Sequence, residues 1–477
     1  MKKRSYSLIC LTMALLMTAS CGGGTATTDT TAGDVDTTTE APEYDRIAEL
    51  GAHDFGGDTF TILDQGTDPN VNTPDETLEG DVINDTIAKR DSLIADMYNV
   101  KIEYVKADYA ERCTMVRNSV LSGDNTYDLL YGPILDQISK LATEGILADL
   151  CSVEELSLDQ SWWSPLIYEN LRLGGKMYYT IGDISPISYR APAVYYVNET
   201  LLENYSIDKN EVYDHVENGT WTLDVLAEYT KDLSQDLNQD GRLYTDDDFF
   251  GALNEDNNLS AACFATAAGV NLSTIADDSI VIDLTNEHVV NVVDKLSGLI
   301  SSAKRSGNPA LHTAFMESRA MFMMHFASSG YTRYRGLDFN YLTIPLPKYD
   351  DNQETYRSMI NTWTNSCICI PTTADLDRAG VIVEAMAFWS QKNLRPVAYD
   401  IALKEKGSRN DRDAVMLDII METRYVDFNA IMEFGGSLNP LSNAIFQGAS
   451  YVSGAESVKE SANAEAEEFV TAWLNEQ

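Results

Sequence analysis

GGKMYYTIGDISPISYRAPAVYYVN, residues 174–198, sets the organisation of this chain. Residues 176–179 (KMYY) form a short aromatic strand after a Gly-Gly turn, and residues 193–197 (AVYYV) form a second apolar strand. The segment between the two strands contains Pro186 and Pro192 and shows no helical period. This pattern predicts a chain that leaves one α/β lobe through an extended crossing and enters another.

The segment before this stretch alternates between strands and helices. Residues 58–64, 100–104 and 127–131 read as strands, and residues 81–98 and 110–121 read as amphipathic helices. That order is typical of a parallel sheet covered by helices. After residue 198, strands are predicted at 249–253 and 321–326, a return crossing at 341–347, and a buried Cys-Ile strand at 367–370.

The N-terminus has the composition of an export signal. Three basic residues precede an apolar run at 8–17, and the small residues 18–20 (TAS) precede Cys21. The run is shorter than the ~20 residues that span a bilayer as a helix. The segment resembles a bacterial lipobox in which Cys21 is lipidated, with Thr18 where Leu is usual. An ordinary signal peptide cleaved nearby is the alternative. Residues 22–44 are rich in Gly, Thr and acid, which predicts a flexible tether.

Charge and cysteine content exclude several classes of protein. The chain has 34 basic and 74 acidic residues and a formal net charge of −40. Such a surface repels phosphate backbones, so nucleic acid is not an expected partner. The same charge weakly disfavours an anionic solute. The cysteines beyond Cys21 form no C-x-x-C pair, so neither a disulfide framework nor a zinc site is indicated.

Residues 236–247 (DLNQDGRLYTDD) have the spacing of a calcium-binding loop. Oxygen-bearing side chains stand at loop positions 1, 3 and 5, and glycine stands at position 6, where an EF-hand turns sharply. The last position is an aspartate where an EF-hand has glutamate, which resembles dockerin-type loops. A polar turn that binds no ion is the alternative, and a bound ion would be structural. The predicted ligand residues are Asp236, Asn238, Asp240, Arg242 and Asp247.

Several short motifs follow one another in an order that resembles the extracellular solute-binding proteins of sugar-type ABC importers. Each motif is loose by itself, and the resemblance extends over nearly all of the chain after the tether. The motifs are 140–149 (KLATEGILAD), 162–165 (WWSP), 175–178 (GKMY), 196–198 (YVN, with Val197 inside the family's Tyr-Asn pair), 219–222 (GTWT), 315–322 (FMESRAMF, with Ser318 for Gly) and 403–406 (LKEK) with the helix at 411–420.

The resemblance implies an α/β protein with the type II periplasmic-binding-protein fold. Two discontinuous lobes joined by a hinge would hold a solute between them. The predicted divisions are a signal peptide at 1–20, a lipidated Cys21 with a tether to 44, a first lobe at 45–188 and 342–395, and a second lobe at 189–341 and 396–477. The implied function is a monomeric, lipid-anchored receptor on the outer face of the membrane. It would bind a carbohydrate and deliver it to an ABC permease.

Polar and aromatic residues near the expected crossings are the candidate ligand contacts. Sugars offer hydroxyl groups to charged and amide side chains and a C–H face to aromatic rings. For each aromatic residue the alternative is packing in the core. The candidates are Asp64, Tyr131, Asp183, Tyr189, Arg190, Glu255, Phe326 and Trp363.

Recognisable catalytic motifs are absent from the sequence. It contains no G-x-S-x-G, phosphate-binding loop, G-x-G-x-x-G or H-E-x-x-H, so a binding protein rather than an enzyme is expected. Acidic residues are so abundant that a carboxylate pair for glycoside hydrolysis is not excluded. An exported glycosidase therefore stays an alternative, as does a binding module that presents its solute to a membrane sensor.

Overall fold

The structure is a computed structural model of the 477-residue chain. It describes residues 45–475 apart from 66–71, 79, 242, 244–246, 277, 301–307, 335 and 405–410. The predicted signal peptide, the tether and Cys21 lie outside the described residues, as does Arg242 of the predicted calcium loop. No helix among the described residues is both long enough and apolar enough to cross a membrane.

The first sheet has four strands in the order β11-β3-β1-β2. The strands β1 (Asp58–Gln65), β2 (Val100–Ala107) and β3 (Leu129–Pro133) are parallel, and β11 (Ser366–Cys369) runs antiparallel to β3. The predictions for the three parallel strands and for the buried Cys-Ile strand are therefore confirmed. The surrounding helices are α1 (Arg46–Leu50), α2 (Val82–Tyr98), α3 (Tyr109–Ser122), α4 (Asp136–Thr143), α5 (Pro165–Leu171) and α13 (Leu376–Lys404), with 3-10 turns at Glu76–Leu78, Leu150–Ser152 and Ser161–Trp163.

The second sheet also has four strands, in the order β5-β8-β4-β9. They are β4 (Ala193–Asn198), β5 (Phe250–Leu253), β8 (Ala320–Phe326) and β9 (Tyr341–Ile344). Strand β8 runs parallel to β5 and antiparallel to β4. The helices that follow β4 are α6 (Glu199–Asn204), α7 (Lys209–Glu217), α8 (Leu223–Thr230), α9 (Asn258–Ala267), α10 (Glu287–Ile300), α11 (Asn308–Met316) and α12 (Ser328–Thr332), with a 3-10 turn before it at Pro186–Tyr189.

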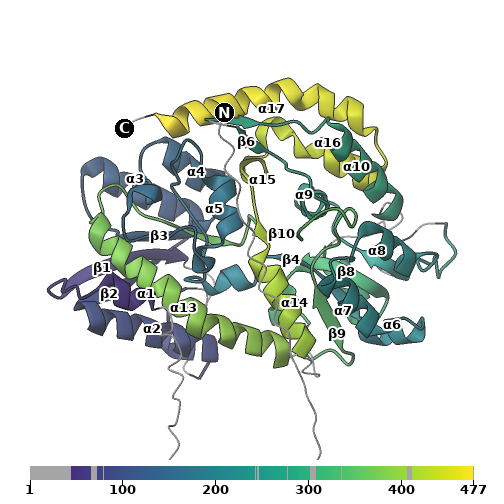
Figure 1. The fold of residues 1–477 in the computed structure, drawn as a ribbon, viewed down its shortest axis with the longest axis horizontal. Helices are drawn as coiled ribbons and strands as arrows, with labels where there is room; N and C mark the ends of the chain where they lie inside the picture. The colour runs from purple at the N-terminus through teal and green to yellow at the C-terminus, as the bar shows by residue number, and fades with distance from the viewer. Residues whose placement is uncertain are drawn as a thin grey trace, which may run out of the picture. The chain divides into compact units, whose positions relative to one another are not determined.

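The C-terminal part of the chain is mostly helical. Its helices are α14 (Asp411–Glu422), α15 (Phe428–Met432), α16 (Leu438–Gln447) and α17 (Tyr451–Leu474), with a 3-10 turn at Phe434–Gly436. Two small sheets pair β6 (Thr274–Ala276) with β7 (Ser279–Val281) and β10 (Ser358–Met359) with β12 (Arg424–Tyr425). Figure 1 shows α17 lying along α16, and these two helices are in contact.

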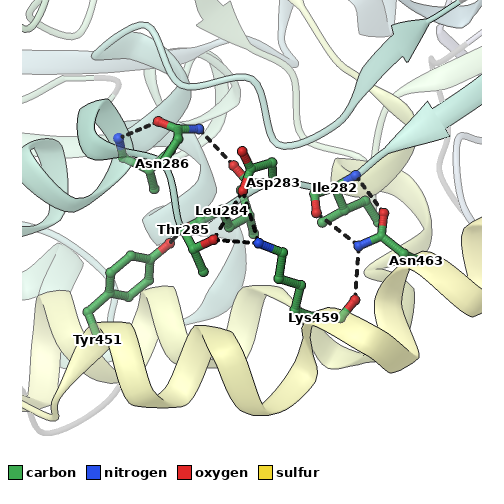
Figure 2. Close-up of polar contacts among 9 residues, drawn as sticks. Ile282, Asp283, Leu284, Thr285, Asn286, Tyr451, Lys459 and Asn463 are labelled. Atoms are coloured by element: carbon green, nitrogen blue, oxygen red, sulfur yellow. Dashed lines mark hydrogen bonds and ion pairs between the residues drawn. The ribbon is translucent and has the colours of Figure 1, made fainter.

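Helix α17 is held by polar contacts with the segment that leads into α10. Lys459 reaches Asp283 and Thr285, and the Tyr451 hydroxyl donates a hydrogen bond to the carbonyl oxygen of Leu284 (Figure 2). The Asn463 side chain bonds both the N–H and the carbonyl of Ile282. The apolar residues near the end of α17 are buried, and the Trp473 ring lies edge-on to Tyr178.

Between the two large sheets, the crossing is almost completely buried. Residues 180–189 all lie in the interior, where the chain packs against the turn that contains Trp163. A Cβ atom at Gly182 would lie 2.5 Å from both the carbonyl oxygen of Trp162 and the ring of Trp163, so the close approach requires glycine. The Trp163 indole N–H donates a 2.6 Å hydrogen bond to the buried Glu384 of α13. Burial and side-chain contacts thus fix the path of the crossing.

Two sequence predictions about the crossings need correction. Residues 176–179 are not a strand, since only isolated bridges at Lys176 and Thr180 connect this segment to its neighbours. Strand β9 pairs with β4, so the chain leaves the second sheet after Ile344, later than the predicted boundary at residue 342. The other limits of the predicted lobes stay predictions.

Candidate functional site

A cavity of about 680 Å³ opens beside the carboxyl ends of strands β2 and β3. Tyr109 and Arg112 line it from the first turn of α3, directly after β2, and Pro133 and Leu135 line it from the end of β3. The carboxyl ends of parallel strands are where ligands bind in open α/β sheets, because the loops that follow these strands diverge there. The position of the cavity is that of a binding site.

Another part of the cavity wall comes from residues 430–433, at the end of α15. Asp427 caps this helix and also accepts hydrogen bonds from the backbone N–H groups of Leu272 and Ser273. Glu433 accepts a 2.9 Å hydrogen bond from the Asn258 side chain at the start of α9, which follows β5 of the second sheet. The cavity therefore lies between elements of the first sheet and elements packed on the second.

Trp363 is the predicted ligand residue that the structure places on the cavity wall. It stands in the loop before β11 and is 63% exposed. The side chain of Asn361 holds this loop by accepting hydrogen bonds from the N–H groups of Trp363 and Thr364. A large ring held beside a cavity and open to solvent is a surface on which the C–H face of a sugar can stack.

Three other aromatic residues that the sequence predicts as ligand contacts are buried in this structure and do not line the cavity. Tyr131 in β3 is fully buried, and Tyr189 and Phe326 are 3% and 4% exposed. The Tyr189 hydroxyl donates to the backbone carbonyl of Asp183, whereas the Tyr131 hydroxyl has no hydrogen-bond partner among the described residues. Burial raises the pKa of both phenols. These rings pack in the interior of the structure.

Asp183, another predicted ligand contact, forms a buried ion cluster in this structure. One carboxylate oxygen pairs with Arg395 of α13, and the other lies 3.3 Å from Nη2 of Arg424 in β12. Asp183 is fully buried, and Arg424 is 1% exposed. Because both oxygens are engaged by guanidinium groups, this residue ties the crossing to the helix and strand that follow the first sheet.

The remaining predicted polar contacts lie outside the cavity wall. The Asp64 carboxylate, near the end of β1, accepts hydrogen bonds from Asn72 (3.0 Å) and Thr73 (2.6 Å). The guanidinium of Arg190 lies over the ring of Tyr331, 5.2 Å from its centroid. Glu255 accepts a 2.9 Å hydrogen bond from the side chain of Asn257. Each of these groups already has a protein partner.

Arg112 is the cavity residue that the sequence did not single out. Its side chain is 1% exposed, and its Nη1 donates to the backbone carbonyl of Tyr131. Its Nε and Nη2 atoms have no hydrogen-bond partner among the described residues. Burial lowers the pKa of this guanidinium, and the nearby Asp64 carboxylate partly opposes the shift. The one sequence signal was the position of Arg112 in the first turn after a strand.

The predicted calcium loop folds so that some of its oxygen donors come together. The Asp236 carboxylate accepts hydrogen bonds from the N–H groups of Asp240 and Gly241, and Gly241 has φ 82°. The Asn238 amide lies 2.6 Å from the Asp247 carboxylate. Among the described residues no group of three or more acidic, histidine or cysteine side chains converges on one point, so the fit to a metal ion is partial.

Comparison with known proteins identifies relatives by fold. No family model matches the chain, and no curated protein sequence matches it significantly. A cyclo/maltodextrin-binding protein in complex with maltotetraose superposes with a TM-score of 0.56 and 16% identity, over 87% of this chain and 97% of that one. An ABC substrate-binding protein from Listeria monocytogenes in complex with cycloalternan gives a TM-score of 0.55 and 11% identity, over 86% and 99%.

Both of these solved structures are of binding proteins rather than enzymes. The identities are low, so the likeness establishes the architecture and not the ligand. Nearly the whole length of each relative is covered, and this chain has two separate four-stranded sheets. The chain has the two-lobed α/β fold of ABC substrate-binding proteins, as its sequence predicts.

Proposed function

We propose that this protein is an exported solute-binding receptor that holds a carbohydrate between its two lobes and delivers it to an ABC permease. The cavity with its exposed Trp363 carries the proposal, because it lies between the carboxyl ends of strands in the first sheet and α15, which Glu433 connects to Asn258 at the start of α9. The fold relatives are seen with maltotetraose and cycloalternan, which supports an oligosaccharide as the class of ligand. Closure of the two lobes over the sugar would create the form that the permease recognises.

The anchor is proposed from the sequence alone. The basic start, the short apolar run and the small residues before Cys21 support export and lipidation at that cysteine. The tether at 22–44 would then hold the folded domain away from the membrane surface. A receptor in this position meets its solute outside the cell and its permease in the membrane.

Hydrolysis of the bound sugar is the competing function. Glycoside hydrolysis normally requires two carboxyl groups on either side of the scissile bond. Among the described residues that line the cavity, Glu433 is the carboxylate. This observation favours binding over turnover, and chromatography of a sugar incubated with the protein would reveal products if the glycosidase alternative were correct.

Replacing Trp363 with alanine is expected to weaken carbohydrate binding by about 1–3 kcal/mol, through loss of a stacked ring. The melting temperature of the free protein should change little, because this side chain is 63% exposed. Titration calorimetry with maltotetraose and a panel of other oligosaccharides would measure the affinity, and X-ray scattering would report compaction as the cleft closes.

Tyr205→Ala is the matched control for this variant. Tyr205 is an aromatic residue that is 40% exposed, and it is not among the residues that line the cavity. It should leave the affinity unchanged. If wild type and Trp363→Ala bind the same sugar with equal affinity, Trp363 is not part of the binding site.

We also propose that the loop at 236–247 binds a structural calcium ion. An ion that binds only the folded form stabilises it by about 2.7 kcal/mol when present at roughly 100-fold excess over its dissociation constant. The melting temperature of chelator-stripped protein should therefore rise with added calcium. Asp236→Asn should abolish this dependence, whereas Glu228→Gln on the exposed face of α8 should retain it. A wild-type melting temperature that millimolar calcium does not change would make the loop a polar turn.

A further inference from the structure

Arg112 presents hydrogen-bond donors that the protein does not use. The guanidinium group carries five N–H donors in a plane, and here Nη1 donates to the carbonyl of Tyr131. The Nε and Nη2 atoms are buried and have no partner among the described residues. Leaving buried donors without acceptors is unfavourable, so an acceptor that entered from the cavity would be strongly favoured.

The unused donors have a definite geometry. Nε and Nη2 lie along one edge of the guanidinium plane, and their N–H bonds on that edge run nearly parallel. Two acceptor oxygens in one plane, at the separation found in a carboxylate, match this edge. Two neighbouring hydroxyl groups of a neutral sugar also offer two oxygens, so geometry alone leaves two kinds of ligand.

Charge distinguishes between a carboxylate and a pair of hydroxyl groups. Among the described residues, Arg112 forms no ion pair, because no carboxylate oxygen lies within 4.0 Å of its guanidinium nitrogens. Burial lowers the pKa of Arg112, and Asp64 is the acidic residue whose charge partly opposes that shift. Its two carboxylate oxygens already accept hydrogen bonds from Asn72 and Thr73. A neutral ligand would satisfy the donors, whereas a carboxylate would satisfy them through two parallel, charge-assisted bonds, which are stronger.

The acidic composition of the chain does not oppose this assignment. Solvent-exposed charges are screened over about 8 Å at physiological ionic strength, so the net charge of −40 has little influence inside a cavity. The neighbours of Arg112 on the cavity wall include Pro133 and Leu135, which are apolar and strengthen a buried electrostatic contact.

We infer that the site selects a carbohydrate bearing a carboxylate, of the uronate type, and that Arg112 binds that carboxylate through Nε and Nη2. This inference rests on the proposed carbohydrate-binding function and narrows its substrate class. Glu433, at the end of α15, has carboxylate oxygens that can accept hydrogen bonds from sugar hydroxyls, although Oε2 already accepts one from Asn258. The bound sugar would therefore be oriented with its acidic group towards α3 and its hydroxyl groups towards α15.

The test uses matched ligands on the unaltered protein, so that it does not depend on any variant folding. Di- and trisaccharides of galacturonate, glucuronate and mannuronate are titrated in three forms: the free acid, its methyl ester and the neutral sugar. The ester keeps the shape of the acid and removes its charge. We expect at least one acid to bind ten times or more tighter than its ester, with an advantage that shrinks as salt is added.

Two substitutions on the same helix supply the protein side of the test. Arg112→Gln should weaken binding of the acid by tenfold or more and leave the ester nearly unaffected. Arg117→Gln removes the same charge from α3 but from a surface ion pair with Glu144, and it should change neither affinity. Arg112→Lys keeps the charge, loses the paired donors and should bind the acid with intermediate affinity.

The outcomes separate the two proposals. Equal affinity for acid, ester and neutral sugar would overturn the assignment of a uronate and leave the carbohydrate receptor standing. Equal effects of Arg112→Gln and Arg117→Gln on the acid would overturn the role of Arg112. If neither this panel nor neutral oligosaccharides bind in any form, the proposed function fails and the inference fails with it.

Discussion

Replacement of Asp183 with asparagine is expected to lower the free energy of unfolding by about 3–5 kcal/mol. The substitution removes the negative charge that compensates Arg395 and Arg424 and keeps the size of the side chain. Arg424 is 1% exposed and has no second carboxylate among its described ion pairs, so its charge would stay buried without a counter-ion. Urea denaturation followed by tryptophan fluorescence would measure the change.

Asp214→Asn is the control for this experiment, because it breaks an ion pair of Arg412 on the surface. The two side chains are 25% and 60% exposed, and such pairs contribute at most about 1 kcal/mol. A loss for Asp183→Asn no larger than that for Asp214→Asn would show that the buried cluster does not stabilise the fold. Sugar affinity of the folded protein should be retained in both variants, since neither carboxylate lines the cavity.

Tyr131→Ala is the second substitution with a large expected effect, a loss of about 3–5 kcal/mol in the free energy of unfolding. The ring is fully buried in the central part of the first sheet, between strands β1 and β11. Removing it would leave a cavity that rigid neighbours fill only in part. Thermal and chemical unfolding should both show the loss.

Tyr131→Phe distinguishes the ring from its hydroxyl group. The hydroxyl is buried without a partner among the described residues, so its removal should not lower stability. Trp363→Ala offers the opposite contrast, with loss of affinity and little loss of stability. If Tyr131→Ala instead kept full stability and lost sugar binding, the ring would belong to the cleft and its assignment to the core would be wrong.

Local patterns in the sequence were sufficient to predict much of the fold. Strands β1, β2 and β4 have alternating or continuous apolar residues, and α2 has an apolar face and an aspartate cap at Asp81. The strand that the sequence predicts at residues 176–179 is absent for a reason that lies far away in the sequence. Tyr178 and Tyr179 are buried because Trp473, almost 300 positions later, packs against them, and not because they pair in a sheet. Burial by a distant helix produces the same apolar pattern as burial in a strand.

The binding site was less predictable than the fold. Tyr131 and Trp363 are both aromatic residues near strand ends, and the sequence does not reveal that one is buried and the other 63% exposed. Arg112 and Arg117 are both arginines of one amphipathic helix, and only the packing of α3 against β3 sends one inward to the carbonyl of Tyr131 and the other to the surface. Which side chain faces a cavity depends on how elements pack together.

The antiparallel strand β11 has a consequence for how the chain is made. It covers one edge of β3, and Cys367 of β11 contacts the carbonyl of Gly132 across 235 positions of sequence. The residues of the second sheet are synthesised between these two strands. A nascent chain therefore has an open, apolar β3 edge until residue 369 has emerged, and closing so long a loop is slow. Until then, this edge can pair with another chain instead of with β11.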